Sequence, residues 1–439
     1  MNNPRLLTGV VAAILLGSGV NAYAQGSTTV TLEELFETAE SHSLQLRPSF
    51  SAENEARQEI SVAKSAMLPE ISASLSLSYI GDGFTTKRNF SDYQKASIPH
   101  YGNGLSLNVS QPVFTGGAIT TGIELAELKL TASRYATELQ RDNIRFQLTR
   151  FYLDIYKYTN LRRVVENNIA QARKVLDEMN ARYEQGVVLQ NDITRYELLV
   201  SNLELNLVKI NNTLDILNHN LVSIAGLPEG TVISPDSTIL QRSLPAQGEM
   251  SWQTEAQSNS PVISLARSKA DITRKAESLV KSELMPKVGL QAGWTIDGPI
   301  LTEVPPINRN LSYWYVGVGV SYNLSSLYKS NKSLARSRAA SINAADELAA
   351  TRENVELGVR ADYIRYMEAY EELKTQTKSV ELAERNYSIV STRYSADMAL
   401  ITDMLDAANS KLDAEQQLVN SRINIIYYYY KLLFTSGKI

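Results

Sequence analysis

Two aspartates late in the chain, Asp403 and Asp406, have the residue type and spacing to bind cations. They are three residues apart in a stretch with helical periodicity, so they share one face of a helix. Asp192 occupies the place equivalent to Asp403 in an earlier, similar stretch. Two interpretations fit these residues: carboxylates that several copies of the chain would repeat as charged rings around an axis, or ordinary solvated acids that the helix dipole favours at a helix start.

The two stretches belong to an internal repeat. Residues 393–412 read RYSADMALITDMLDAANSKL, and a similar segment, RYEQGVVLQNDITRYELLVS, begins at Arg182. The copies align without a gap from Arg182/Arg393 to Gly226/Gly437. Repeats of this kind indicate that one structural unit is used twice.

Each copy contains a residue suited to a tight turn shortly after its Arg-Tyr pair. Gly186 stands in the first copy and Asp397 at the equivalent place in the second. Glycine adopts a left-handed backbone freely, and aspartate is among the few other residues that tolerate one. We therefore predict a helix–helix turn at each position.

Other chemistries find little support in the chain. His42, His100 and His219 show no metal-ligand spacing, and neither a G-x-x-x-x-G-K nor a G-x-S-x-G motif occurs. The chain has 43 basic and 47 acidic residues, so no electrostatic case exists for nucleic acid. It has no cysteine, which excludes disulfides and a lipidated cysteine. We expect no enzyme, no cofactor and no metal site.

The first 24 residues predict a secretory signal peptide. Arg5 supplies the positive start, residues 6–20 an apolar run, and Ala22-Tyr23-Ala24 a small-x-small cleavage site. No later stretch approaches the ~20 apolar residues of a transmembrane helix. An exported chain without such a helix is periplasmic, extracellular, or inserted in an outer membrane as β-strands.

Four segments alternate apolar and small polar residues with the two-residue period of a β-strand. Each is about as long as the 9–11 residues that a tilted strand needs to cross a bilayer. Aromatic residues lie toward the strand ends, where they would meet lipid headgroups. The strands form two hairpins, one at about 69–114 and one at about 286–324; their end aromatics are Tyr79, Trp294, Tyr313 and Trp314.

Long helices follow each hairpin. Proline-free helical sequence extends from about 117 and from about 329, and each helix is roughly 100 Å long at ~1.5 Å per residue. After the first turn, apolar residues recur at alternating intervals of four and three residues, which predicts coiled-coil packing. This seam comprises Leu189, Ile193, Tyr196, Val200, Leu203, Leu207, Ile210, Leu214, Leu217, Leu221 and Ile224.

The second copy has a similar but sparser seam along its last helix. Its predicted members are Leu405, Ala408, Leu412, Val419, Ile426, Tyr430 and Leu433. We therefore predict four segments: a signal peptide (1–24), a first repeat (25–230), a connector (231–251) and a second repeat (252–439). The long helices of the second repeat cover about 329–437 and match those at about 117–226 in the first.

Four strands are too few to close a membrane barrel, and an open sheet edge in lipid leaves backbone groups unpaired. Several chains must therefore share one barrel. Two chains would give eight strands with a filled interior, whereas three would give twelve with room for water. The serine- and glycine-rich strand faces suit a wet lumen, so we expect a trimer.

This layout resembles the TolC-type outer-membrane efflux proteins over nearly the whole mature chain. The resemblance rests on the paired Leu-Pro and Met-Pro strand openings, QPVFTGG at 111–117, and the repeated Arg-Tyr segment with its later aspartate. It implies a mainly α, α+β membrane protein: a homotrimer with a shared 12-stranded β-barrel, continued by a coiled-coil helical barrel in the periplasm. It also implies an exit duct of the outer membrane, working with a periplasmic adaptor (membrane fusion protein) and an inner-membrane transporter in efflux or type I secretion.

The resemblance also implies a gate at the periplasmic helix tips. Stacked carboxylate rings map onto Asp403 and Asp406, and closing hydrogen bonds map onto Tyr394 and Asp192. The chain departs from the family at Ala399, where an arginine of the closing link is expected, so the clasp must be weaker or differently built. The turns at Gly186 and Asp397 become candidate docking points for the adaptor.

A soluble periplasmic coiled-coil adaptor, without channel activity, is the alternative interpretation of the long helices. The strands discriminate between the two, because an adaptor has no need of two hairpins with aromatic ends. An outer-membrane enzyme is a more distant alternative, since no nucleophile or acid–base constellation stands out.

Overall fold

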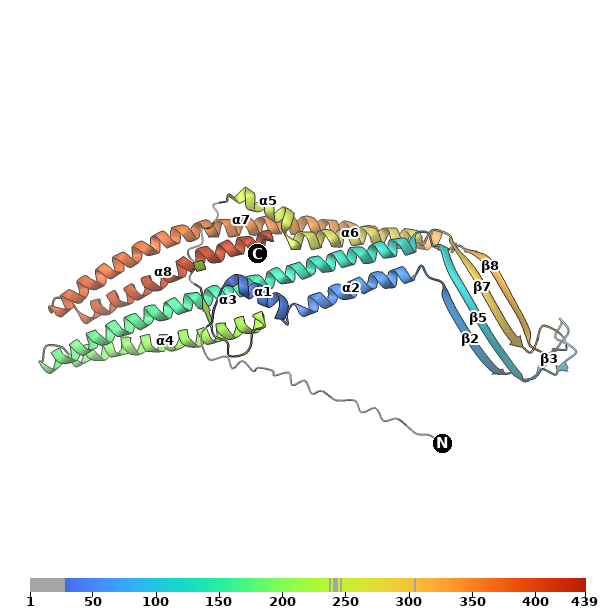
Figure 1. The fold of residues 1–439 in the computed structure, drawn as a ribbon, viewed down its shortest axis with the longest axis horizontal. Coiled ribbons are helices and arrows are strands. Elements are labelled where there is room, and N and C mark those ends of the chain that lie inside the picture. The colour runs from blue at the N-terminus through green and yellow to red at the C-terminus, as the bar shows by residue number, and fades with distance from the viewer. Residues whose placement is uncertain (1–27, 237, 240–243, 245–246, 304) are drawn as a thin grey trace, which may run out of the picture.

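The computed structural model describes residues 28–439 apart from 237, 240–243, 245–246 and 304. The predicted signal peptide lies outside the described residues. Long helices fill one end of the elongated chain and a small sheet the other (Figure 1). The strands are β1 (Thr28–Val30), β2 (Glu70–Tyr79), β3 (Gly83–Thr85), β4 (Gln94–Ala96), β5 (Tyr101–Phe114), β6 (Ile233–Pro235), β7 (Lys287–Gly298) and β8 (Leu311–Ser321).

The helices form two antiparallel hairpins whose tips lie together, far from the sheet (Figure 1). One hairpin is α3 with α4, and the other is α7 with α8. Within the described part of the chain, no helix combines the length and apolar character needed to cross a membrane. The helices are α1 (Leu32–His42), α2 (Arg47–Ser65), α3 (Ala118–Glu184), α4 (Gln190–Ala225), α5 (Glu249–Asn259), α6 (Pro261–Ser282), α7 (Ser326–Ser395) and α8 (Ile401–Ser436).

The four long strands form one antiparallel sheet in the order β2-β5-β7-β8. The two predicted hairpins are therefore joined, because β5 of the first pairs with β7 of the second, from Asn103↔Gly298 to Phe114↔Val288. A bulge between Pro112 and Phe114 interrupts this pairing, as expected where a proline cannot donate to the ladder. β2 and β8 are the two edges of the sheet.

Local sequence signals explain the first helices. Thr31 caps α1: its hydroxyl accepts a hydrogen bond from Glu34 N at 3.3 Å, and the Glu34 carboxylate accepts one from Thr31 N at 2.8 Å. Thr31 and Glu34 thus form a capping box. The helical chain breaks between His42 and Arg47, and Pro48 fits the first turn of the helix that follows.

The best-buried core lies midway along the helical part, where α1, α3, α4 and α8 meet. Tyr152 is buried here, and its hydroxyl donates to Val30 O at 2.9 Å and accepts from Asp236 N at 2.7 Å. One side chain therefore ties α3 to the chain on both sides of the short parallel pair β1–β6. Burial raises the pKa of Tyr152 to about 12, so its hydroxyl keeps its proton at neutral pH.

The predicted seam on α4 is buried at Ile193, Tyr196, Val200 and Leu203, and these residues pack between the hairpins. Leu189 is exposed, because it precedes the first helical turn. On α8 the prediction is only partly right. Ile426 and Tyr430 are buried as expected. Nearer the tip, however, Leu405, Leu412 and Val419 are only partly buried, and the buried positions include Met404, Ala407, Lys411 and Ser421.

Lys411 explains part of this shift. Its ammonium donates to Gln171 Oε1 at 2.7 Å and lies 5.0 Å from the centroid of the Tyr387 ring. Glu415, 3.7 Å from the ammonium, accepts a hydrogen bond from Asn168 at 2.7 Å. A buried charge is tolerated only with such partners, and together they link α3, α7 and α8 in one polar layer.

Asp142 on α3 predicts a pH-dependent stability. Burial raises its pKa from 3.8 to about 6, against the opposing charge of Arg145. The folded chain thus binds more protons than the unfolded chain between about pH 4 and pH 6, so the free energy of unfolding falls as pH rises through that window. Asp142→Asn removes the penalty. Because the carboxyl is partly exposed, we expect a gain of about 1 kcal/mol at pH 7.5.

Chemical denaturation followed by circular dichroism at pH 4 and pH 7.5 checks this expectation. The gain should be confined to the higher pH, because a protonated aspartic acid and an asparagine are both neutral. An equal gain at both pH values would assign the effect to side-chain shape instead of charge.

Candidate functional site

The tips of the two hairpins carry all the residues that the sequence proposes for a gate. Gly186, with φ of 76°, turns the chain between α3 and α4, and Asp397, with φ of 60°, does so between α7 and α8. The predicted left-handed turns are confirmed at both positions. Each has the same hydrogen bond across it, Val187 N to Arg182 O at 3.0 Å and Met398 N to Arg393 O at 2.8 Å.

An ion pair joins the two tips. The Arg182 guanidinium, at the end of α3, pairs with the Asp397 carboxylate in the α7–α8 turn. A second nitrogen of Arg182 donates to the backbone carbonyl of Tyr394 at 3.4 Å. The arginine side chain is mostly covered and the aspartate mostly exposed. Sequence reasoning used Arg182 only as a repeat marker and missed this contact.

Tyr394 lies within the same charged group. Burial raises the pKa of its hydroxyl, the Asp192 carboxylate raises it further, and the Arg182 guanidinium opposes both. The structure thus brings together Asp192 and Tyr394, the two residues assigned to the closing link, and adds Arg182 and Asp397. Ala399 contributes no charge, so the cationic member of this group comes from the first repeat.

Asp403 and Asp406 lie on the first turns of α8, and both are exposed in the single chain. The Asp403 carboxylate accepts a hydrogen bond from Leu400 N at 3.1 Å, so it caps the helix. This is the role of an ordinary acid at a helix start, which the sequence offered as one alternative. The cap uses Oδ2, and neither hairpin of the same chain covers the two carboxylates.

A cavity of about 290 Å³ opens beside the ion pair, between α3 and α7. Met179 and Met404 are buried at its apolar side, while Arg182 and Tyr394 form the polar side. The tip therefore contains space that the side chains of one chain do not fill. Loose packing at this point leaves space for the hairpins to shift against each other.

The sheet at the other end has two chemically distinct faces. Apolar side chains on one face remain exposed in the single chain, for example Trp314 at 74% and Val316 at 71%. The other face carries mainly serine, glycine and amide side chains, with Ser106 opposite both Ser74 and Thr295, and with Tyr313 and Tyr315 on β8. The first face suits lipid and the second suits water.

The remaining candidates lie apart. His42 and His100 each contact a backbone carbonyl, of Thr38 and Ile80 respectively. Over the described ranges, no group of three or more histidine, cysteine, aspartate or glutamate side chains is placed to hold a metal ion.

The family model "Outer membrane efflux protein" matches residues 35–227 and 252–426 of the chain. The chain is 21% identical to the outer membrane protein TolC of Escherichia coli over 436 residues, which covers 94% of this chain and 83% of TolC. It is 21% identical to the outer membrane efflux protein BepC of Brucella suis, covering 98% and 90%. Its fold matches the outer membrane protein VceC of Vibrio cholerae with a TM-score of 0.76 at 17% identity, over 92% and 96%.

Proposed function

Because the chain belongs to the outer membrane efflux protein family, we propose that it is the outer-membrane duct of a tripartite efflux pump or a type I secretion system. The single observation that carries this proposal is the sheet β2-β5-β7-β8. It presents an exposed apolar face, and it continues directly into helices about 100 Å long. Such a chain connects a membrane to a compartment well beyond it.

The same sheet supports a homotrimer. Its edges β2 and β8 cannot stay unpaired in lipid, since each free backbone group costs several kcal/mol. Three copies supply twelve strands around a lumen lined by serine and glycine. The helices of the three chains then continue the lumen into the periplasm. The duct is passive, and the energy for transport comes from the inner-membrane transporter.

We place the gate at the hairpin tips. The ion pair of Arg182 with Asp397 holds the two hairpins of one chain together, with Asp192 and Tyr394 beside it. In a trimer Asp403 and Asp406 would form two stacked rings of three carboxylates. The turns at Gly186 and Asp397 are the outermost points, and we propose that the periplasmic adaptor docks there.

The alternative, a soluble coiled-coil adaptor, predicts different behaviour in two experiments. A duct requires detergent for extraction from membranes, runs at the mass of three chains, and conducts ions after reconstitution into planar bilayers. An adaptor stays in solution without detergent and produces no current. A water-soluble protein without conductance would overturn the proposal.

A further inference from the structure

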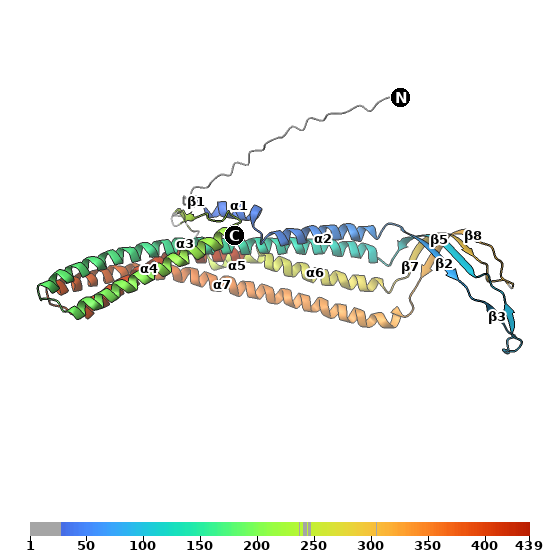
Figure 2. The same ribbon diagram turned by 90° about the horizontal axis from the view of Figure 1, so that it is seen from below.

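The helices nearest the sheet form a single layer in the order α2, α3, α6, α7, with α2 and α7 at its two sides (Figure 2). α2 has no fully buried residue, and only the side toward α3 is partly covered. The first turns of α7 are likewise covered on one side only, toward α6. Each outer helix therefore has a free face, and the edge strands β2 and β8 continue these free faces into the sheet.

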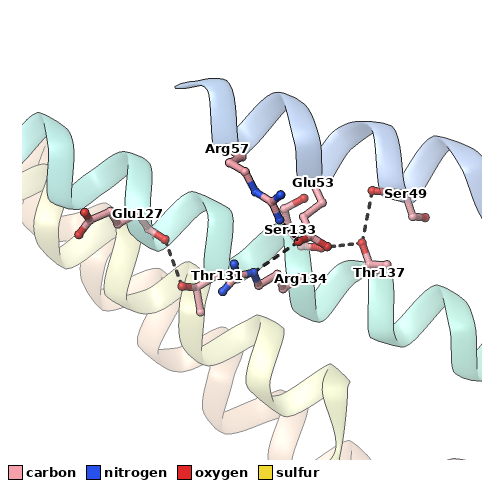
Figure 3. A network of polar contacts seen from close by, with 8 residues as sticks. All are labelled: Ser49, Glu53, Arg57, Glu127, Thr131, Ser133, Arg134 and Thr137. Atoms are coloured by element: carbon pink, nitrogen blue, oxygen red, sulfur yellow. Dashed lines mark hydrogen bonds and ion pairs between the residues drawn. The ribbon is translucent and has the colours of Figure 1, made fainter. Parts of the chain in front are cut away.

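Polar contacts hold the layer together where apolar burial is slight. Between α2 and α3, Glu53 pairs with Arg134 at 3.5 Å, and Thr137 donates to Ser49 O at 3.3 Å (Figure 3). Between α3 and α6 the Glu124 carboxylate pairs with the Lys275 ammonium. Complementary charge is thus the common feature of the neighbouring helices in this part of the chain.

The internal repeat allows the contact between α3 and α6 to serve as a template. α2 corresponds to α6, because SAMLPEI at 65–71 matches SELMPKV at 282–288. α3 corresponds to α7, because Arg182 matches Arg393. Lys275 then corresponds to Gln58, and Glu124 to Ala335. If α3 is replaced by its counterpart α7, then α6 is replaced by its counterpart α2. The α2 that would lie on the free side of α7 belongs to another chain.

The correspondence can be checked within the chain. Glu59 of α2 pairs with Lys129 of α3, and the corresponding helices α6 and α7 are joined by Glu277 and Arg338 at 3.3 Å. These four residues match to within two positions under the same alignment. The repeat therefore sets corresponding helices side by side with ion pairs at nearly the same height along them.

We propose that α7 packs against α2 of a second copy of this chain, with Ala335 opposite Gln58 of that copy. This inference rests on the trimer of the proposed function and adds the register by which it closes. Charge supports it. The first turns of α7 carry only basic charge, at Lys329, Lys332, Arg336 and Arg338, whereas Glu55 beside Gln58 makes no ion pair among the described residues.

Apolar residues complete the two faces. Tyr328 and Ile342 lie seven residues before and after Ala335, so all three share one helix face, and Ile342 is 63% exposed. Val62 lies four residues after Gln58 on α2 and is 68% exposed. Packing a second copy on this side buries these side chains between flanking charges.

The absence of native cysteine allows a direct test. The double variant Gln58→Cys/Ala335→Cys is treated in its detergent-solubilised form with a short thiol-specific bismaleimide. Because α2 and α7 lie on opposite sides of one chain (Figure 2), a bridge between them joins different chains. We expect a covalent trimer on a denaturing gel, since three bridges close a ring. The matched control, Gln58→Cys/Ser337→Cys, places the second thiol on the α7 side covered by α6 and should stay monomeric on the gel.

Two outcomes would overturn the register. If the protein runs as a trimer in native gels but the control pair crosslinks, or neither pair crosslinks, the register is wrong and the proposed duct is unaffected. A monomer in native gels would refute the register together with the proposed assembly.

A charge exchange gives a second readout. Arg336→Glu should lower the temperature at which the trimer dissociates, and Arg336→Glu/Glu55→Arg should restore it. If the second substitution lowers the temperature further, the two side chains do not face each other.

Discussion

Replacing Arg182 with methionine should open the proposed duct. Arg182→Met keeps the apolar stem of the side chain but removes the charge that pairs with Asp397 across the two hairpins. A partly exposed pair of this kind is worth about 1 kcal/mol. Three copies in a trimer contribute about 3 kcal/mol to the closed state, which corresponds to roughly a hundredfold shift toward the open state.

Single-channel recording in planar bilayers measures this shift as a rise in open probability and mean conductance. The matched control is Arg173→Met, which removes an ion pair of 2.6 Å between Arg173 and Glu204 within the α3–α4 hairpin. That pair does not join two hairpins, so its loss should leave conductance unchanged. Equal effects of both substitutions would mean that the general loss of positive charge, and not the loss of the Arg182–Asp397 ion pair, causes the change in conductance.

Asp397→Asn should reproduce the effect of Arg182→Met, because asparagine removes the charge and still tolerates the left-handed backbone. The double variant should conduct no more than either single variant, since both substitutions delete the same interaction. Additive effects would place the two residues in separate interactions.

The second large effect concerns the acids of α8. We expect multivalent cations added from the periplasmic side to block the current of the proposed duct, and Asp403→Asn/Asp406→Asn to weaken that block strongly. Three like charges in each ring repel one another, and a bound cation relieves that repulsion. Each ring removed should weaken the block at least about tenfold, which equals ~1.4 kcal/mol. Asparagine also retains a capping oxygen at position 403, so the helix start should survive.

Titration of the cation against single-channel current gives the apparent affinity of each variant. Glu381→Gln is the control, because Glu381 is an exposed acid of α7 that Lys378 and Arg385 already neutralise. Its block should equal that of the unaltered protein. A double aspartate variant with undiminished block would remove Asp403 and Asp406 from the gate.

Local patterns in the sequence predict most of the elements. Strand alternation, helix caps and the turn residues Gly186 and Asp397 act over a few residues, so their structural outcome can be read without tertiary information. The short pairs β3–β4 and β1–β6 were not predicted, because three-residue strands have too little periodicity.

Long-range partners could not be predicted in the same way. The pairing of β5 with β7, the Arg182–Asp397 pair and the burial of Lys411 join residues far apart in the chain. A lysine in a helix is normally exposed to solvent. The seam predicted for α8 contained apolar residues only, and it therefore left out Lys411. The repeat contained one pattern from which the contact at the tip could have been predicted. Both copies have an arginine, Arg182 and Arg393, but only the second turn has a carboxylate at the turn position, Asp397.

That asymmetry determines how a trimeric tip would dilate. Inside each chain Arg182 of the α3–α4 hairpin pairs with Asp397 in the α7–α8 turn. At the corresponding junction between chains Arg393 would lie beside Gly186, which has no carboxylate with which to pair. In a trimer the three junctions within chains would therefore each have an ion pair that the three junctions between chains lack, and the six hairpins would separate fully only when the pairs within the chains also break.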